Sequence, residues 1–237
     1  MSKNSTDREK LRKRFQKSLL KLGIFDLLPK VIYEELFGIA ALRHFNVGQV
    51  IYLEGERADF VYILEKGWVK SSQITRKGRE QGLLFLKPVE IFGDIAVFTE
   101  TSYPGTTTAL EAVEVWVIPS DKFLEIVNRC PGLALAIIRK LSFRVLHFIS
   151  LVDDLSLKSV ESRLASTLLQ YAESHNGQLI VQRRTWTTLD EMAIRFGTVR
   201  NVLSRAMIKL ESEGYIKVEK QSIILLNPDD LAERADN

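Results

Sequence analysis

The segment TTLDEMAIRFGTVRNVLSRAMIKLESEGY, residues 187–215, determines how the rest of the chain is interpreted. Thr187 and Thr188 offer an N-cap hydroxyl to a first helix, and Gly197 stands where that helix must end and turn. A second helix is predicted from about Val199 to Glu213, because apolar residues recur there at steps of three and four. The segment therefore predicts two helices joined by a tight turn.

The second helix is expected to have one apolar face and one hydrogen-bonding face. The residues expected to be buried are Val202, Leu203, Ala206 and Leu210. The residues expected to point away from them are Arg200, Asn201, Ser204, Arg205 and Lys209. Such a helix packs on its own domain and presents hydrogen-bonding groups to a partner.

Two details distinguish this pair of helices from a generic amphipathic hairpin. The small residue Ala193 and the turn at Gly197 permit the helices to cross closely, and Leu203 is placed to fill the space between them. After Gly214 the segment YIKVEKQSIILL alternates and breaks near its middle, which predicts a two-stranded wing. The pattern indicates a DNA-reading module; the alternative is an ordinary helical hairpin with a solvated charged side.

Composition limits the class of protein. At 237 residues and 46% hydrophobic content the chain is long enough for two modest domains, each with its own core. A single cysteine excludes an internal disulfide, no apolar run approaches membrane-spanning length, and the amino-terminal residues are too polar for a signal peptide. We therefore expect a cytoplasmic protein with no membrane partner.

The charge balance does not by itself identify a partner. The net charge is +3, and the basic excess is concentrated in REKLRKRFQKSLLK, residues 8–21, rather than around the two predicted helices. That run is interpreted as the solvated face of a helix with a buried side, and a phosphate-binding arm is the alternative. The buried side would consist of Leu11, Phe15, Leu19 and Leu22.

The region between Leu42 and Pro119 has the rhythm of an all-β structure. Short apolar segments recur there every eight to twelve residues and are separated by glycine, proline or charged turns. A helical interruption is expected after Gly93, in the segment DIAVF. A glycine turn at a helix start presents backbone amides to an anion, although the same turn also serves purely structural purposes.

A long helix is predicted from Gly132 to Ser156. Its apolar residues follow alternating steps of four and three, which is typical of a parallel dimer seam; a buried core helix is the alternative. The predicted seam consists of Ala134, Ile138, Leu141, Val145, Phe148, Val152 and Leu155. Asp153, Asp154 and Ser156 are expected to form a hinge to a second domain that opens with a helix from about Leu157.

Several stretches together resemble the Crp/Fnr transcription regulators, and the resemblance covers nearly the whole chain. They are VGQVIYLEGERADFVYILEKGWVK, FGDIAVF, CPGLALAIIRKLSFRV and GTVRNVLSRAMIKLESEGYI. The resemblance implies an α+β chain: a jelly-roll β-barrel like cyclic-nucleotide-binding domains (1–130), a dimerisation helix and hinge (131–156), and a winged helix-turn-helix (157–237). It also implies a homodimer that binds a two-fold-symmetric site on double-stranded DNA, with RNA polymerase as a further partner of an activator.

The resemblance also assigns roles in the reading helix. Members that respond to cyclic AMP carry an Arg-Glu pair and a second arginine, and the matching residues here are Arg200, Asn201 and Arg205. Arginine pairs with guanine and asparagine with adenine, so a half-site that contains guanine but differs from the cyclic-AMP type is expected. Phosphate contact is the alternative role for Arg200, whereas Asn201 and Arg205 are the better candidates for base contact. The further DNA-binding candidates are Ser204, Lys209 and Thr198; for Ser204 and Lys209, phosphate contact and mere solvation are both open.

The chain lacks a residue that one class of effector needs. Cyclic-nucleotide binders of this family place an arginine after the glycine turn to neutralise the phosphate, whereas the matching positions here are Pro104 and Gly105. Cyclic AMP is therefore not expected. The residues left to line an effector pocket are Gly93, Asp94, Ile95, Thr106 and Thr107.

Other effectors stay open at this point. An iron–sulfur cluster needs several cysteines and the chain has Cys130 alone, which is interpreted as buried or as a redox-sensitive thiol. Haem-based sensing of nitric oxide or carbon monoxide is an alternative, with His44 or His147 as the ligand. An unidentified metabolite, or control without a ligand, is the remaining interpretation.

Two other classes of protein are less consistent with the sequence. No nucleophile elbow, phosphate loop, metal-spaced histidine pair or paired catalytic carboxylates occur, so an enzyme is not expected. A small-molecule-binding module without DNA activity would leave Arg200, Asn201 and Arg205 without a role.

Overall fold

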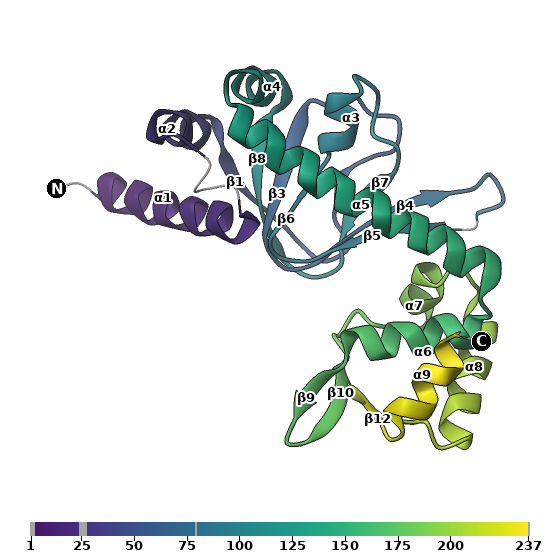
Figure 1. The fold of residues 1–237 in the computed structure, drawn as a ribbon. Helices are drawn as coiled ribbons and strands as arrows, with labels where there is room; N and C mark the ends of the chain where they lie inside the picture. The colour runs from purple at the N-terminus through teal and green to yellow at the C-terminus, as the bar shows by residue number, and fades with distance from the viewer. Residues whose placement is uncertain (1–2, 24–27, 79, 237) are drawn as a thin grey trace. The chain divides into compact units, whose positions relative to one another are not determined.

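The computed structural model describes residues 3–23, 28–78 and 80–236 (Figure 1). It divides into two compact units, of which the first comprises residues 1–79 and 83–144 and the second residues 80–82 and 145–237. The division falls inside helix α5 (Pro131–Leu157), so this helix belongs to both units. Each unit is described by itself.

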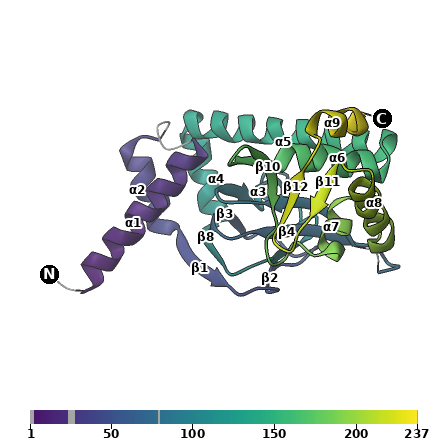
Figure 2. The ribbon, with the colours of Figure 1, turned by 90° about the horizontal axis from the view of Figure 1, so that it is seen from below.

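The first unit contains two sheets and the helices that flank them (Figures 1 and 2). One sheet has the order β1-β8-β3-β6 and the other the order β2-β7-β4-β5. The strands are β1 (Ala41–Phe45), β2 (Val50–Tyr52), β3 (Phe60–Lys66), β4 (Val69–Ile74), β5 (Glu80–Leu86), β6 (Glu90–Phe92), β7 (Thr106–Ala109) and β8 (Val113–Pro119). The helices are α1 (Lys3–Leu22), α2 (Lys30–Ile39), α3 (Asp94–Phe98), α4 (Ser120–Arg129) and the first part of α5. The predicted jelly-roll barrel is confirmed.

Alternation along the central strands creates two cores. In β3, Val61 and Ile63 face the flanking helices while Tyr62 and Leu64 face the barrel interior, because successive side chains of a strand point to opposite faces. Strand β8 repeats the pattern, with Trp116 on the helix side. Helices α1, α2, α4 and α5 thus share one core with the outer face of this sheet.

Helix α1 is an integral part of the first unit. Phe15 and Leu19 are fully buried, and the Phe15 ring packs edge-on against Trp116 at a centroid distance of 4.9 Å. On the polar side, Arg14 pairs with Glu65 and Glu114 on the barrel. The buried side predicted for this helix is confirmed, and Arg14 on its other side pairs with the barrel.

The second unit contains the end of α5 and a small α+β domain. Its elements are α6 (Val160–Tyr171), β9 (Glu173–His175), β10 (Gln178–Gln182), α7 (Leu189–Arg195), α8 (Arg200–Ser212), β11 (Ile216–Val218), β12 (Ser222–Leu225) and α9 (Pro228–Asp236). The predicted wing corresponds to β11 and β12, and it is extended by β10 and β9 into a sheet of order β11-β12-β10-β9.

The hinge expected at Asp153, Asp154 and Ser156 is wrong, because all three residues lie within α5. The helical break comes later, where the Ser159 hydroxyl accepts a hydrogen bond of 3.1 Å from the Ser162 amide and starts α6. The Ser159 cap fixes where α6 starts, so the break between the helices lies at residues 158 and 159 and not at the aspartates.

Candidate nucleic-acid interface and effector site

The turn between α7 and α8 has the geometry that the sequence predicted. The Thr188 hydroxyl caps α7 by accepting from the Glu191 amide at 3.2 Å, and Gly197 adopts φ +62° after the helix ends. The Thr198 amide donates to the Ala193 carbonyl at 3.0 Å, which closes the turn. Leu203 is fully buried between the helices. A helix-turn-helix is therefore present.

The buried face of α8 differs from the prediction at one residue. It consists of Leu203, Ala206, Met207 and Leu210. Val202 was expected in this face but keeps 38% of its surface exposed. The buried stripe of α8 is centred on Leu203 and Leu210, so Val202 falls on its flank and Met207 fills the other flank instead.

Three of the predicted DNA-contacting residues lie on the exposed face of α8. Arg200, Asn201 and Arg205 are all exposed, and the Arg205 Nε donates to the Asn201 carbonyl at 3.3 Å within the helix. Thr198 and Ser204 are half-buried at the edge of this face. The side chains that carry guanidinium and amide donors are thus presented together.

Lys209 has a structural partner inside the domain. Its Nζ lies 2.8 Å from Glu161 Oε2 on α6, and Arg234 on α9 binds the same oxygen at 2.6 Å. The hydrogen bond from Lys209 and the nearby Arg234 hold the pKa of Glu161 below its usual value. The phosphate contact considered for Lys209 therefore competes with an ion-pair network that ties α8 to α6 and α9.

Asp190 is a residue of this surface that the sequence reasoning missed. Its Oδ2 lies 2.9 Å from Arg200 Nη1, and both side chains are exposed. The sequence feature that could have predicted this contact is the separation of ten residues across a helix-turn-helix. This separation brings the first turn of α7 close to the first turn of α8. The reading face thus carries an acidic residue beside its first arginine.

In the barrel, the predicted glycine turn is tightly enclosed. Gly93 adopts φ +77°, and a Cβ at this position would meet Tyr62 Cδ2 at 3.0 Å and the Phe60 carbonyl at 3.1 Å. Only glycine fits both the conformation and the space. The turn begins α3, so Asp94 is the first residue of this short helix and Ile95 is half-buried beside it.

Asp94 is paired with an arginine from the long helix. Arg144 Nη1 lies 2.9 Å from Asp94 Oδ1, and Arg144 Nη2 donates to the Ile91 carbonyl at 2.7 Å. The Asp94 side chain is 1% exposed and the Arg144 side chain 13% exposed. The only acidic residue predicted for the effector pocket is therefore neutralised by the chain itself, and sequence reasoning did not foresee this contact.

The space beneath this turn is filled by aromatic rings. Tyr52 stacks on Tyr103 at a centroid distance of 3.8 Å, and Tyr62 stacks on Phe92 at 5.0 Å. All four are buried, and burial raises the pKa of Tyr52 and of Tyr62 above the usual tyrosine value. These phenols stay protonated at neutral pH and act as packing groups.

The other predicted pocket residues lie on or near β7. Thr107 is fully buried, whereas the Thr106 hydroxyl accepts from the Glu54 amide at 3.1 Å. A Cβ at Gly105 would meet the Ser72 carbonyl at 2.9 Å, and the Pro104 carbonyl accepts from Gln73 Nε2 at 2.6 Å. The segment that matches the phosphate-binding positions of cyclic-nucleotide binders is thus packed against β4.

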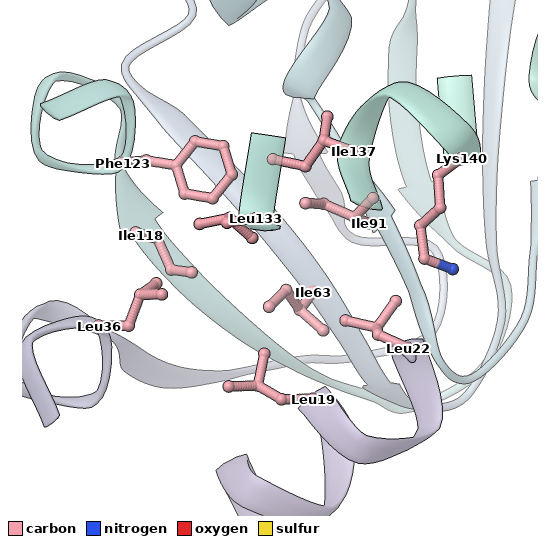
Figure 3. Close-up of a pocket in the computed structure, with 10 residues that line it drawn as sticks. All are labelled: Leu19, Leu22, Leu36, Ile63, Ile91, Ile118, Phe123, Leu133, Ile137 and Lys140. Carbon is pink, nitrogen blue, oxygen red and sulfur yellow. The ribbon is translucent and has the colours of Figure 1, made fainter. Parts of the chain in front are cut away.

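An apolar cavity lies on the face of the sheet β1-β8-β3-β6 that packs against the flanking helices, away from the barrel interior (Figure 3). Nine of its ten lining residues are apolar, and Lys140 is the exception. The lining residues are Leu19, Leu22, Leu36, Ile63, Ile91, Ile118, Phe123, Leu133, Ile137 and Lys140. The cavity contains neither histidine nor cysteine, and none of the residues predicted for the effector pocket lines it.

The histidines and the cysteine considered as ligands or redox groups lie on different elements. His44 is exposed on β1, with its Nε2 3.8 Å from Glu114 Oε2, and His147 is exposed on α5. Cys130 is buried in the core shared by the helices and the sheet. Among the described residues, no group of three or more histidine, cysteine, aspartate and glutamate side chains is arranged to hold a metal ion.

The long helix α5 exposes apolar side chains. Of the predicted dimer residues, Ile138, Val145 and Val152 are exposed, whereas Leu141 packs on the core of the first unit and Phe148 is half-buried. Leu155 lies outside the residues whose side chains are described. The exposed set also includes Leu135, Phe143, Leu146 and Ile149.

None of the helices in the described ranges has both the length and the apolar character needed to cross a lipid bilayer.

Comparison with known proteins matches two family models on this chain. The model for the Cyclic nucleotide-binding domain matches residues 42–130, and that for the Crp-like helix-turn-helix domain matches residues 162–234. The "CRP-like cAMP-activated global transcriptional regulator" of Mycobacterium tuberculosis is 27% identical over 195 residues, which are 81% of this chain and 86% of that protein. The "Anaerobic regulatory protein" of Bacillus subtilis is 25% identical over 211 residues, 86% of this chain and 87% of that protein.

A solved structure supports the fold. FixK2 from Bradyrhizobium japonicum superposes with a TM-score of 0.71 at 20% identity, covering 82% of this chain and 96% of that chain. The first matched model spans the barrel, and the second spans the small domain that contains the helix-turn-helix. The chain therefore belongs to the Crp/Fnr family of DNA-binding transcription regulators.

Proposed function

We propose that this protein is a homodimer that binds a two-fold-symmetric DNA site through α8 and that cyclic AMP is not its effector. The observation that carries the DNA part is the shared exposure of Arg200, Asn201 and Arg205 on one helix of a helix-turn-helix. Guanidinium groups pair with guanine O6 and N7, and an asparagine amide pairs with adenine N6 and N7. The half-site is expected to contain both bases.

The dimer rests on the exposed apolar residues of α5. Ile138, Val145 and Val152 recur every seven residues and are 58%, 56% and 60% exposed, respectively. Heptad spacing of apolar residues is what a two-stranded coiled coil buries. A dimer would present two reading helices, and inverted half-sites on DNA match such a pair.

The dimer is tested by one substitution and a matched control. Val152→Glu is expected to shift the protein to a monomer in sedimentation analysis, because the charge would be buried in the seam. Ser150→Glu adds the same charge on the other side of the helix and should leave the dimer intact. A Val152→Glu protein that still sediments as a dimer contradicts the proposed interface.

The exclusion of cyclic AMP rests on the barrel. The pair of Asp94 and Arg144, the aromatic rings beneath it and the packed segment at Gly105 occupy the region where the resemblance places a cyclic nucleotide. The chain also offers Pro104 where the family's phosphate-neutralising arginine would stand. A buried phosphate without a cationic partner costs several kcal/mol, roughly the penalty of an unpaired buried charge.

The decisive experiment is a selection from random duplex DNA by the purified protein at a fixed salt concentration, with and without cyclic AMP. We expect an enriched inverted repeat with guanine-containing half-sites about one helical turn apart. The affinity for that repeat should be the same in both arms. Absence of enrichment in both arms contradicts DNA reading by the protein without a further effector, and enrichment only with cyclic AMP contradicts the exclusion of this effector.

A further inference from the structure

The ion pair between Asp190 and Arg200 joins the two helices of the DNA-reading motif. Asp190 Oδ2 and Arg200 Nη1 are 2.9 Å apart, and the side chains are 60% and 61% exposed. Exposed ion pairs contribute little to stability, so folding alone is a weak reason for this pair. The position of the pair at the start of α8 points instead to an effect on how Arg200 contacts DNA.

Both partners stand on fixed backbone. Asp190 lies in the first turn of α7, where the Thr188 hydroxyl binds the Glu191 amide at 3.2 Å. Arg200 is the first residue of α8, whose start is set by the turn at Gly197. The carboxylate is thus held at a defined place beside the first turn of the reading helix.

Electrostatics explains why an arginine and a carboxylate occur together at this position. The amino end of a helix carries partial positive charge, so an arginine at the start of α8 is disfavoured unless an anion lies beside it. Conversely, a carboxylate on a surface that meets DNA repels phosphate. Pairing offsets the first cost and reduces the second without abolishing it, so each residue explains the presence of the other.

The ion pair leaves one edge of the Arg200 guanidinium available for a base. A guanidinium has five donors in a rigid plane, and Nη1 already donates to Asp190. The edge formed by Nε and Nη2 remains available, and two parallel donors of this kind match guanine O6 and N7. Arg205 differs, because its Nε donates to the Asn201 carbonyl at 3.3 Å and, among the described residues, no carboxylate pairs with it.

We propose that Asp190 is a positioning residue that orients Arg200 to read one guanine of the half-site. The inference rests on the proposed DNA-binding function and deepens it. Because Asp190 also carries a negative charge toward DNA, it should lower affinity for unrelated sequences while raising discrimination at one base pair. A purely structural residue would change affinity for all sequences alike.

The test compares four single variants and one double variant on the selected duplex. Arg200→Ala first identifies the guanine that depends on Arg200, by the position where discrimination is lost. Asp190→Asn and Asp190→Ala are then measured on the selected duplex, on a duplex with that guanine replaced by adenine, and on unrelated DNA. Glu191→Gln is the matched control, because it removes one negative charge from the same turn and leaves the ion pair in place.

We expect Asp190→Asn to reduce discrimination at that guanine about tenfold, which is within the range for loss of one bidentate contact. Affinity for unrelated DNA should stay the same or rise. The double variant Asp190→Asn with Arg200→Ala should lose no more than Arg200→Ala alone, and Glu191→Gln should discriminate as the unmodified protein does. Thermal unfolding of each variant serves as the folding readout.

Two outcomes overturn the inference, and they are distinguishable. If the unmodified protein reads the guanine and Asp190→Asn reads it equally well, or weakens all sequences equally, Asp190 has no positioning role while DNA reading stands. If the unmodified protein enriches no sequence, the proposed function fails and this inference fails with it.

Discussion

The glycine turns of the two units are built alike and are used differently. Gly93 and Gly197 both adopt positive φ shortly before a helix, and in each case a charged residue in the first turn of that helix meets an opposite charge. In the barrel the pair is Asp94 with Arg144, which is buried. In the helix-turn-helix the pair is Arg200 with Asp190, which is exposed.

Burial determines what each pair can do. Two charges removed from water are stable only while both are present, so Asp94 and Arg144 lock α3 to the long helix. Two charges in water attract weakly, so Arg200 keeps donors available for a partner. The comparison teaches that similar local geometry serves packing in one unit and recognition in the other.

The largest expected effect tests the buried pair. Asp94→Ala should lower the free energy of unfolding by about 3–5 kcal/mol, because it leaves the Arg144 charge in a poorly hydrated site. Asp190→Ala should change it by less than about 1 kcal/mol. Denaturant unfolding of both variants measures the difference.

A double variant separates the charge from the packing. Asp94→Ala combined with Arg144→Met should be less destabilised than Asp94→Ala alone, since no buried charge is left without a partner. If Asp94→Ala and Asp190→Ala cost the same, burial is not what distinguishes the two turns.

The next effect asks whether burial or position in α8 sets the cost of a substitution. Leu203→Ala should destabilise the second unit by about 2–5 kcal/mol, because it opens a cavity between α7 and α8. Val202→Ala, one residue earlier, should change stability by about 0.5 kcal/mol or less, because its side chain is partly exposed. Equal losses for both would restore Val202 to the buried face.

A smaller effect concerns recognition without a change in stability. Arg205→Ala should cost about 1–3 kcal/mol of binding on the preferred duplex and relax specificity at one position. The midpoint of thermal unfolding should be unchanged, because the Arg205 side chain is exposed. Fluorescence anisotropy titrations on the preferred and the altered duplex provide the measurement, and sequence discrimination that survives the substitution would contradict base reading by Arg205.

The smallest expected effect is dependent on pH. The hydrogen bond from Lys209, followed by the interaction with Arg234, lowers the pKa of Glu161 in the folded state. A carboxylate with a lowered folded pKa stabilises the protein above its unfolded pKa of about 4.3, and the contribution is lost as pH falls through the folded pKa.

Glu161→Gln should therefore lower the free energy of unfolding by up to about 1 kcal/mol at pH 7. The difference from the unmodified protein should shrink as the pH is lowered below about 4. Unfolding curves at both pH values check this, and a difference that stays constant with pH would mean that the ion pairs contribute nothing.

Local patterns predicted much of this molecule. The N-cap at Thr188, the turn at Gly197 and the exposed Arg200, Asn201 and Arg205 follow from spacing along one or two helices. Predictions that depended on a helix boundary or a neighbouring helix were weaker. The hinge at Asp153 and the burial of Val202 were wrong for that reason.

By itself, the sequence determined the order of the elements, the helix-turn-helix and its donor-bearing face, because period and capping act within a few residues. Only the tertiary structure decided that Arg144 meets Asp94, that Glu161 holds Lys209 and that Asp190 lies beside Arg200. These partners are ten to fifty residues apart. Their meeting depends on how packed elements bring distant side chains together, which no local period encodes.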